Sequence, residues 1–222
     1  MTDFTLARRT MVDRQIRPAD VTDRKILDAI GEVPREQFAP LELRPLAYSD
    51  ADLLVTPAGS LGERFLVEPT ILARLLQLAE VGEDDIVLDI GCATGYSSAV
   101  LSFVANSVVA LEENEDLAEI ATETLLNLDI GNVAVLTGPL ADGYAPEGPY
   151  DVIVMLGAVE EVSNALLGQL KRGGRLVTII GAGPDGVATL FYRNGGEVSR
   201  RAAFHAPVPT LPGFAKPRSF AF

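Results

Sequence analysis

The sequence predicts an α/β protein built on a Rossmann-like, doubly wound and mostly parallel sheet. From residue 83 onward, short apolar runs alternate with stretches of helical periodicity, which is typical of βαβ units. The hydrophobic fraction is 48%, whereas aromatic residues supply 6% and Trp is absent. That balance is typical of a buried sheet of Val, Ile and Leu covered by helices. The length of 222 residues suits one core over 69–222 with an N-terminal helical and loop extension over 1–68.

The extension contains one clear helical pattern. Apolar residues follow helical spacing between Ile26 and Val33, and Thr22 is placed to cap a helix that ends near Gly31. Residues 39–62 hold several Pro and Gly without a lasting period, which predicts an ordered loop region. Pro69 then suits the first turn of an amphipathic helix that leads into the core.

The elements of the core follow in order. Predicted strands cover 86–90, 107–111, 133–137, 151–156 and 175–180, and predicted helices cover 97–104, 115–128 and 162–170. Strands that alternate with helices are joined by right-handed crossovers, so these strands should be parallel. The last two apolar runs, 187–192 and 198–204, are separated by Asn194-Gly195-Gly196, which indicates a C-terminal antiparallel hairpin.

Charge and residue counts exclude several classes of function. The chain has 18 Lys and Arg against 31 Asp and Glu, a formal charge of −13, which repels phosphate backbones and argues against nucleic acid as a partner. One Cys and one His supply neither an intramolecular disulfide nor a Cys/His metal site, so we expect no metal. There is no long uncharged apolar run and no signal-peptide pattern, so we expect a cytoplasmic protein with no membrane partner.

A ligand site is predicted after the first core strand. This strand holds Asp89 near its end and is followed by a turn in which Gly91 and Gly95 allow close approach of a ligand. The next helix offers free backbone amides there. Glu112 ends the second strand, 21 residues after Gly91, where a carboxylate can accept both hydroxyls of a ribose. Asp89 could accept hydrogen bonds from an ammonium group or from the amides of the turn. This arrangement indicates a nucleoside ligand.

Three interpretations of the turn remain open. A dinucleotide fingerprint needs a small residue after Gly95, and the bulky Tyr96 disfavours it. S-adenosylmethionine has no pyrophosphate and suits an acidic strand end with a Gly-x-x-x-Gly turn, so we favour it. The third interpretation is a glycine-rich turn without a ligand. Cys92 is interpreted as a small turn residue that lines the pocket rather than as a reactive thiol.

Eight segments spread over nearly the whole chain carry a family resemblance. They are residues 11–16, 23–30, 33–38, 47–48, 87–91, 95–101, 149–153 and 169–177. Together they resemble the protein-L-isoaspartate O-methyltransferase family. The N-terminal segments discriminate best, above all Val-Pro-Arg-x-x-Phe at 33–38, because glycine-rich cofactor turns recur in many methyltransferases.

The resemblance implies a methyltransferase core over 69–222 that transfers a methyl group from S-adenosylmethionine to an isoaspartyl carboxylate in a damaged protein or peptide. S-adenosylhomocysteine would be the product. An ionised carboxylate needs no His as general base, so the scarcity of His is no obstacle. Implied cofactor-binding residues are Asp89, Gly91, Cys92, Ala93, Gly95, Tyr96, Glu112, Glu113, Pro139, Leu140 and Leu156. Implied substrate residues are Arg64, Phe65, Leu66 and Val67, and no catalytic residue is assigned.

The segment before Pro69 departs from the pattern Gly-x-x-Thr-Ile-Ser-x-Pro that is usual in the family. Phe65 stands at the Thr and Val67 at the Ser, so both hydroxyls are missing where a carboxylate should dock. Glu68 would repel that carboxylate further. Arg64 could bind it instead, or be an ordinary surface arginine.

Three further departures surround the turn. Pro139 and Leu140 stand where the family has an Asp near adenine, and Leu156 stands where it often has a Thr. Ala93 replaces a frequent glycine, which is compatible with a turn residue whose φ is negative.

Three hypotheses of function follow. The first is an isoaspartyl methyltransferase. The second is a methyltransferase with a different, less polar acceptor, suggested by Phe65, Leu66, Val67 and Leu156. The third is a cofactor-binding sensor or scaffold without catalysis. The Pro-rich segment 207–212 could cover the domain's own sheet edge or a partner's, and the oligomeric state is left open.

Overall fold

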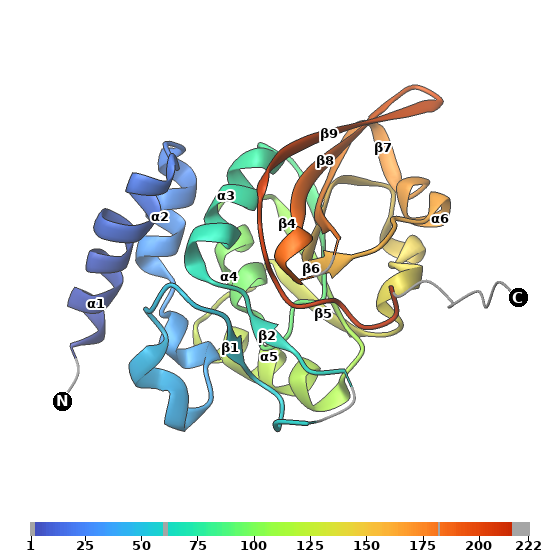
Figure 1. Cartoon of the computed structure of the whole chain (residues 1–222). Helices are drawn as coiled ribbons and strands as arrows, with labels where there is room; N and C mark the ends of the chain where they lie inside the picture. The colour runs from blue at the N-terminus through green and yellow to red at the C-terminus, as the bar shows by residue number, and fades with distance from the viewer. Residues whose placement is uncertain (1–2, 60–61, 182, 215–222) are drawn as a thin grey trace, which may run out of the picture.

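A seven-stranded sheet forms the centre of the molecule in the computed structural model, which describes residues 3–59, 62–181 and 183–214 (Figure 1). The strand order is β5-β4-β3-β6-β7-β8-β9. The parallel strands are β3 (Ile86–Ile90), β4 (Ser107–Glu112), β5 (Val133–Thr137), β6 (Tyr150–Val159) and β7 (Leu170–Ile180). An antiparallel hairpin, β8 (Val187–Asn194) and β9 (Glu197–His205), completes one side. The predicted fold class and hairpin are therefore confirmed.

The chain reverses its direction of winding at β3, which pairs with both β4 and β6. From β3 the chain proceeds outward through β4 to β5, and then returns to the other side of β3 through β6 and β7. Ligands of doubly wound sheets bind at such a point, beyond the carboxyl ends of the strands. The predicted site after β3 therefore lies where the topology places one.

Helices cover the two faces of the sheet unequally. Side chains of β3 alternate between the faces, so that Val87 and Leu88 belong to different hydrophobic clusters. One face is covered by α3 (Pro69–Ala79), α4 (Tyr96–Ser102) and α5 (Glu115–Asn127). The other is covered by short turns, by α6 (Asn164–Leu167) and by the end of the chain.

The predicted helix over 162–170 is wrong in extent. Ser163 caps α6, and the helix ends after one turn at Gly168. The reason is tertiary, because Leu170 already pairs with Tyr150 of β6 and so begins the strand β7. The strands β6 and β7 are correspondingly longer than predicted.

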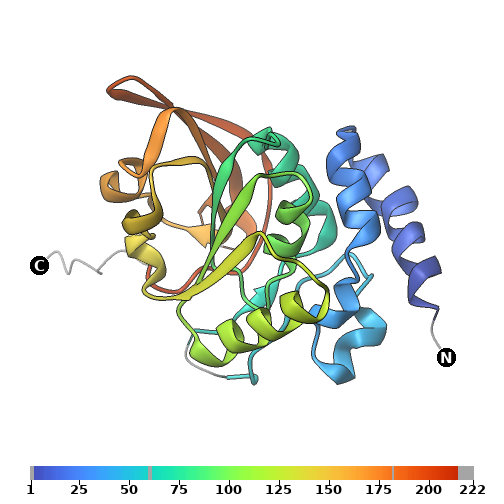
Figure 2. The same ribbon diagram turned by 180° about the vertical axis from the view of Figure 1, so that it is seen from behind.

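The N-terminal residues form an outer layer against α3 and α4 (Figure 2). This layer holds α1 (Phe4–Met11), a π-helical turn (Val12–Ile16) and α2 (Arg24–Glu32). The predicted cap Thr22 is wrong, since the carboxylate of Asp23 accepts the hydrogen bond from the Lys25 amide at 2.9 Å. Asp23 is itself the N-cap residue, and its carboxylate lies next to the free amides of the first turn, whereas Thr22 lies one residue too early.

The described part of the loop region after α2 is ordered, as predicted, and residues 60–61 of that region lie outside the described residues. It contains 3₁₀ turns at Arg35–Phe38 and Leu41–Leu46, and then a small hairpin of β1 (Leu53–Leu54) and β2 (Phe65–Leu66). Buried residues of the N-terminal layer, such as Met11, belong to the same hydrophobic cluster as Leu75 of α3. The division into units at residue 68 stays a prediction.

The end of the described chain, residues 206–214, is here called the C-terminal segment. It passes across the end of the sheet after β9 (Figure 1). Ala158 of β6 donates its amide to Pro209 O, and the Leu211 amide donates to Ala158 O, both at 2.8 Å. The segment therefore lies against the end of a central strand, not along a sheet edge. Within the described ranges, the structure has no helix long and apolar enough to cross a membrane.

Candidate functional site

The turn between β3 and α4 carries three consecutive odd-numbered residues in the left-handed region, Gly91 (φ 80°), Ala93 (φ 50°) and Gly95 (φ 92°). The negative φ expected for Ala93 is wrong. A residue with a Cβ adopts this conformation at a cost of about 1–2 kcal/mol, and here its amide donates to Glu112 Oε2 at 2.8 Å. A Cβ on Gly95 would lie 3.1 Å from Ala121 Cβ of α5. The absence of a side chain at Gly95 therefore allows α5 to pack closely against the turn, and its role in ligand approach stays a prediction.

Asp89 is fully buried beneath the turn. Its Oδ2 accepts hydrogen bonds from the hydroxyls of Ser97 and Ser98, both at 2.6 Å, so these serines take the role that was expected of the turn amides. Its Oδ1 has no partner among the described residues. Burial raises the pKa of Asp89 to about 6, against the opposing effect of the two serine hydroxyls. A buried acceptor without a donor is a group that a ligand's ammonium or hydroxyl could satisfy.

Glu112 ends β4 beside this turn and is fully buried. The Arg64 guanidinium forms a forked contact with it, from Nη2 to Oε2 at 2.9 Å and from Nε to both oxygens at 3.2 Å. Backbone amides of Ala93, Glu113 and Asn114 donate to the same carboxylate at 2.8, 3.1 and 3.2 Å. Two carboxylate oxygens offer roughly four acceptor positions. Glu112 therefore has no acceptor capacity left for ribose hydroxyls in this arrangement.

Leu211 of the C-terminal segment covers the turn from the other side. A Cβ on Gly91 would lie 2.6 Å from Arg64 Nη2 and 2.7 Å from Leu211 Cδ2, and one on Gly157 would lie 2.6 Å from Leu211 Cγ. A side chain at either glycine would therefore require Arg64 or Leu211 to shift. The close approach that Gly91 was predicted to allow is real, but the groups that approach it are Arg64 and Leu211.

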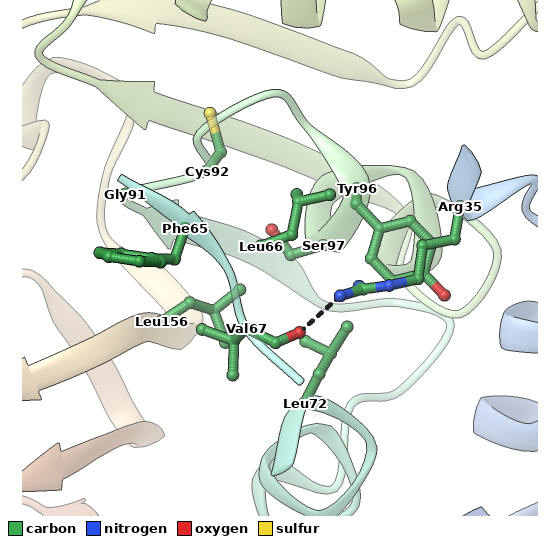
Figure 3. Close-up of a pocket in the computed structure, with 10 residues that line it drawn as sticks. All are labelled: Arg35, Phe65, Leu66, Val67, Leu72, Gly91, Cys92, Tyr96, Ser97 and Leu156. Carbon is green, nitrogen blue, oxygen red and sulfur yellow. Dashed lines mark hydrogen bonds between the residues drawn. The ribbon is translucent and has the colours of Figure 1, made fainter. Parts of the chain in front are cut away.

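The segment that was expected to contact substrate is apolar. Phe65, Leu66 and Val67 line a cavity together with Gly91 and Leu156, and the volume of this cavity is about 10 Å³ (Figure 3). That is close to the smallest space that holds one water molecule. The apolar side chains therefore leave almost no free space beside the turn.

Arg35 forms the far wall of this cavity and is completely buried. It donates from Nη2 to the carbonyl of Val67 at 2.9 Å (Figure 3), and from Nε to the carbonyl of Ala47 at 2.8 Å. Its guanidinium lies over the ring of Tyr96, 4.6 Å from the centroid, and Tyr96 packs edge-on against Phe38. Burial lowers the pKa of Arg35. Arg35 thereby fixes the backbone of the 65–67 segment against α4.

An acidic cluster flanks the same segment. The Glu68 amide donates to Asp52 Oδ1 at 2.8 Å, and Asp50 Oδ1 accepts from the Thr70 amide at 3.3 Å. Burial raises the pKa of Glu68 to about 7, with the charges of Asp50 and Asp52 adding to the effect. Negative charge thus accumulates beside the segment expected to receive a carboxylate.

The structure brings most of the predicted residues together at the carboxyl ends of the central strands, and the other predicted residues lie around this site. The cavity is lined by Phe65, Leu66, Val67, Gly91, Cys92, Tyr96 and Leu156. Glu113 and Pro139 are exposed, and Leu140 is buried in the hydrophobic cluster that also contains Leu211. Burial raises the pKa of Cys92 well above its usual value, which agrees with a turn residue and not with a reactive thiolate.

Five residues of the site were missed, namely Arg35, Leu72, Ser97, Ser98 and Leu211. Arg35 and Ser97 lie in segments whose resemblance was noted, but burial of a charge and the direction of a hydroxyl depend on tertiary contacts. Leu211 follows an irregular Pro-rich stretch that has no periodicity to show where it packs. Among the described residues, no group of three or more Cys, His, Asp or Glu is arranged to hold a metal ion.

A family model described as Protein-L-isoaspartate(D-aspartate) O-methyltransferase (PCMT) matches residues 7–207. The chain belongs to this family. A protein-L-isoaspartate O-methyltransferase of Koribacter versatilis is 36% identical over 182 residues, which cover 82% of this chain and 80% of that protein. One of Methanoculleus marisnigri is 37% identical over 174 residues, which cover 78% of this chain and 77% of that protein.

Solved structures agree with this assignment. One described as a protein-L-isoaspartate O-methyltransferase superposes with a TM-score of 0.81 at 28% identity, covering 93% of this chain and 66% of that one. A Plasmodium falciparum structure, described as a putative enzyme of the same name in complex with S-adenosyl-L-homocysteine, has a TM-score of 0.77 at 18% identity and covers 92% of this chain. The latter likeness concerns the fold alone.

The family's methyl donor does not fit the site as the chain is arranged. The orphaned Asp89 Oδ1 would suit a ligand donor. However, Arg64 occupies the carboxylate of Glu112, and Leu211 lies against Gly91. The cavity beside Gly91, Cys92 and Leu156 has a volume of only about 10 Å³. The site has the elements of a cofactor site, and the protein itself fills it.

Proposed function

We propose that this protein is an S-adenosylmethionine-dependent methyltransferase that acts on isoaspartyl carboxylates of damaged proteins or peptides. The observation that carries the proposal is the family match over residues 7–207, which includes both the N-terminal layer and the sheet. The relatives at 36–37% identity are named for this activity. This match favours the isoaspartyl acceptor over the two other hypotheses.

The acceptor is recognised here without the loop hydroxyls that are usual in the family. The backbone of residues 65–67 is held by Arg35, whereas the side chains around it are apolar. An isoaspartyl carboxylate placed there would need donors from backbone amides or from Arg64, since an unpaired carboxylate in an apolar pocket is strongly disfavoured. We infer that acceptor affinity is low, and that the setting is the cytoplasm, where the single free Cys92 suits a reducing compartment.

A methyl-transfer assay tests the proposal. The protein is incubated with S-adenosylmethionine that carries a labelled methyl group and with an isoaspartyl peptide. The matched control is the same peptide with a normal aspartyl residue. We expect base-labile methyl ester on the isoaspartyl peptide alone. Equal labelling of both peptides, or labelling of neither by protein shown to bind S-adenosylhomocysteine, would contradict the proposed acceptor.

A further inference from the structure

Two parts of the chain that are distant in sequence meet over the turn after β3. One is the Arg64 side chain, which reaches Glu112, and the other is the C-terminal segment, which places Leu211 on Gly91 and Gly157. Arg64 and Leu211 are both almost fully buried, with 3% of each residue exposed. These contacts occupy the position that doubly wound sheets offer to ligands.

We propose that Arg64 and Leu211 are an internal occupant of the cofactor site, and that S-adenosylmethionine binds only when both are displaced. The inference rests on the proposed function, because it concerns the cofactor of that reaction. When Arg64 is displaced, Glu112 exchanges one set of hydrogen-bond donors for another. The hydroxyls of a ribose take the place of the guanidinium at Glu112, and Arg64 becomes free to face an anionic acceptor.

The segment that carries Arg64 is held by few bonds. Its hairpin consists of two strands of two residues each. Beyond the strand pairing, the Arg64 carbonyl accepts from the Val55 amide at 2.8 Å, and the Arg64 amide donates to Thr56 Oγ1 at 3.1 Å. A hairpin this small has little stability of its own. The flanking residues are held by Arg35 at Val67 and by Asp52 at Glu68, whereas the Arg64 side chain itself is held at Glu112.

The C-terminal segment is held by an isolated bridge between Ala158 and Thr210. Pro207, Pro209 and Pro212 have no amide hydrogen, so the segment cannot extend the pairing with β6 into a strand. Beyond the two hydrogen bonds to Ala158, its later part is held by the side chains of Leu211 and Phe214, which belong to the buried cluster. Release of these side chains would leave the pairing of the sheet strands unchanged.

A groove separates the two parts on the outside. It has a volume of about 1090 Å³ and is lined by Glu63 and Phe65 on one side and by Pro207, Pro209 and Thr210 on the other. In the interior the two parts meet at Gly91, where Arg64 and Leu211 approach the same glycine, and on the groove side Gly62 lies near Pro212. The groove leaves space beside both parts.

The closed arrangement lowers the apparent affinity for the cofactor in proportion to the fraction of molecules that are open. A substitution that weakens the occupant raises this fraction. Leu211→Ala removes the side chain that covers Gly91 and Gly157. Arg64→Lys keeps the positive charge beside Glu112 but loses the forked contact, and so weakens the occupant without leaving a buried carboxylate unpaired.

The test is calorimetric titration of the full chain with S-adenosylhomocysteine. We expect Leu211→Ala and Arg64→Lys each to bind at least tenfold more tightly than the unaltered protein. Leu166→Ala is the matched control, because Leu166 is completely buried in the same cluster as Leu211 but lies on α6. It should destabilise the fold without changing the dissociation constant.

A second readout uses Cys92, the only cysteine of the chain. It lies beside Gly91 and is 2% exposed. Without ligand, a thiol reagent should modify it several-fold faster in Leu211→Ala than in the unaltered protein, and no faster in Leu166→Ala. The labelling rate reports opening directly and does not depend on binding.

The outcomes separate the two proposals. Equal dissociation constants for the unaltered protein and both site variants would overturn the internal occupant and leave the methyltransferase proposal intact. An equal gain in Leu166→Ala would overturn it too, because general loosening would then explain the effect. Absence of binding to every variant at millimolar ligand would overturn both proposals, even if Cys92 became accessible.

Discussion

Arg64 and Glu112 form a forked ion pair in which the side chains are 4% and 0% exposed. The pair joins the hairpin of residues 53–66 to the end of β4, and it sits where a cofactor's ribose was predicted. A buried pair is costly to break from one side, because the remaining charge has no partner and no water. The same contact thus has consequences for stability as well as for binding.

We expect Arg64→Met to lower the free energy of unfolding by about 3–5 kcal/mol. Adding Glu112→Gln should restore part of that loss, because no buried charge remains and the amide oxygen still accepts from the backbone amides on one side, whereas its NH2 group cannot accept from those on the other. Urea denaturation of the two variants measures the difference. If Arg64→Met alone is as stable as the unaltered protein, the ion pair is not formed in solution.

Glu68 should make the fold less stable as the pH rises. Its pKa in the folded protein is about 7, above the ordinary value of 4.5, because burial and the charges of Asp50 and Asp52 disfavour the ionised form. The folded state therefore holds the proton more tightly than the unfolded chain, and the stability from this group is lost between about pH 4.5 and pH 7. Glu68→Gln should exceed the unaltered protein in stability above that range and match it below.

The measurement is the midpoint of thermal unfolding as a function of pH. Glu42→Gln, at an exposed position on a 3₁₀ turn, is the control for the loss of one negative charge. If the two variants shift the curve alike, the net charge of the chain and not the position of Glu68 is responsible.

Arg175 fastens the end of α3 to the sheet. It donates to the carbonyls of Ala79 and Glu80 at 2.7 and 3.0 Å, and to Asp85 Oδ2 at 2.5 Å. We expect Arg175→Ala to lower the free energy of unfolding by about 2 kcal/mol, because the two carbonyls and the Asp85 carboxylate lose their hydrogen bonds to a charged donor. Arg175→Lys should recover less than half of the lost stability, since the single ammonium group cannot bind the carbonyls of α3 and the Asp85 carboxylate together as the planar guanidinium does. Arg172→Ala, on an exposed part of the same strand, should change the urea midpoint little.

A hydroxyl at residue 67 should improve the reaction. Val67→Ser introduces a donor into the apolar wall, and a hydrogen bond to a carboxylate is worth about 1.5–3 kcal/mol. We expect isoaspartyl methyl transfer to rise by about tenfold, mainly through a lower KM for the peptide. Val67→Ala removes similar side-chain volume without adding a donor. A similar gain in methyl transfer by that variant would show that the added space, and not the hydroxyl, causes the gain.

Periodic segments were predicted well. Residues 86–90 and 133–137 have the bounds expected from their apolar runs, and the turn after β3 lies where its glycines indicated. These elements depend on local pattern, which a single sequence contains. The helix α1 was not foreseen, because only its buried end at Met11 contributes to the core and its other residues are largely polar or exposed.

The sequence indicated which residues meet at the candidate site, but not which other side chains contact them. Asp89, Gly91 and Glu112 do converge at the carboxyl ends of β3 and β4. Their partners could not be foreseen, because Arg64 and Leu211 come from irregular segments whose path is set by tertiary contacts. The positive φ of Ala93 has the same cause, since it follows from the hydrogen bond to Glu112.

The anchoring of the 65–67 segment by Arg35 uses only main-chain acceptors, the carbonyls of Ala47 and Val67. Replacing the side chain at position 67 therefore leaves the anchor in place. Substitutions in this wall change the lining of the cavity without removing that anchor, which makes the segment a practical one for redesigning which acceptor the protein prefers.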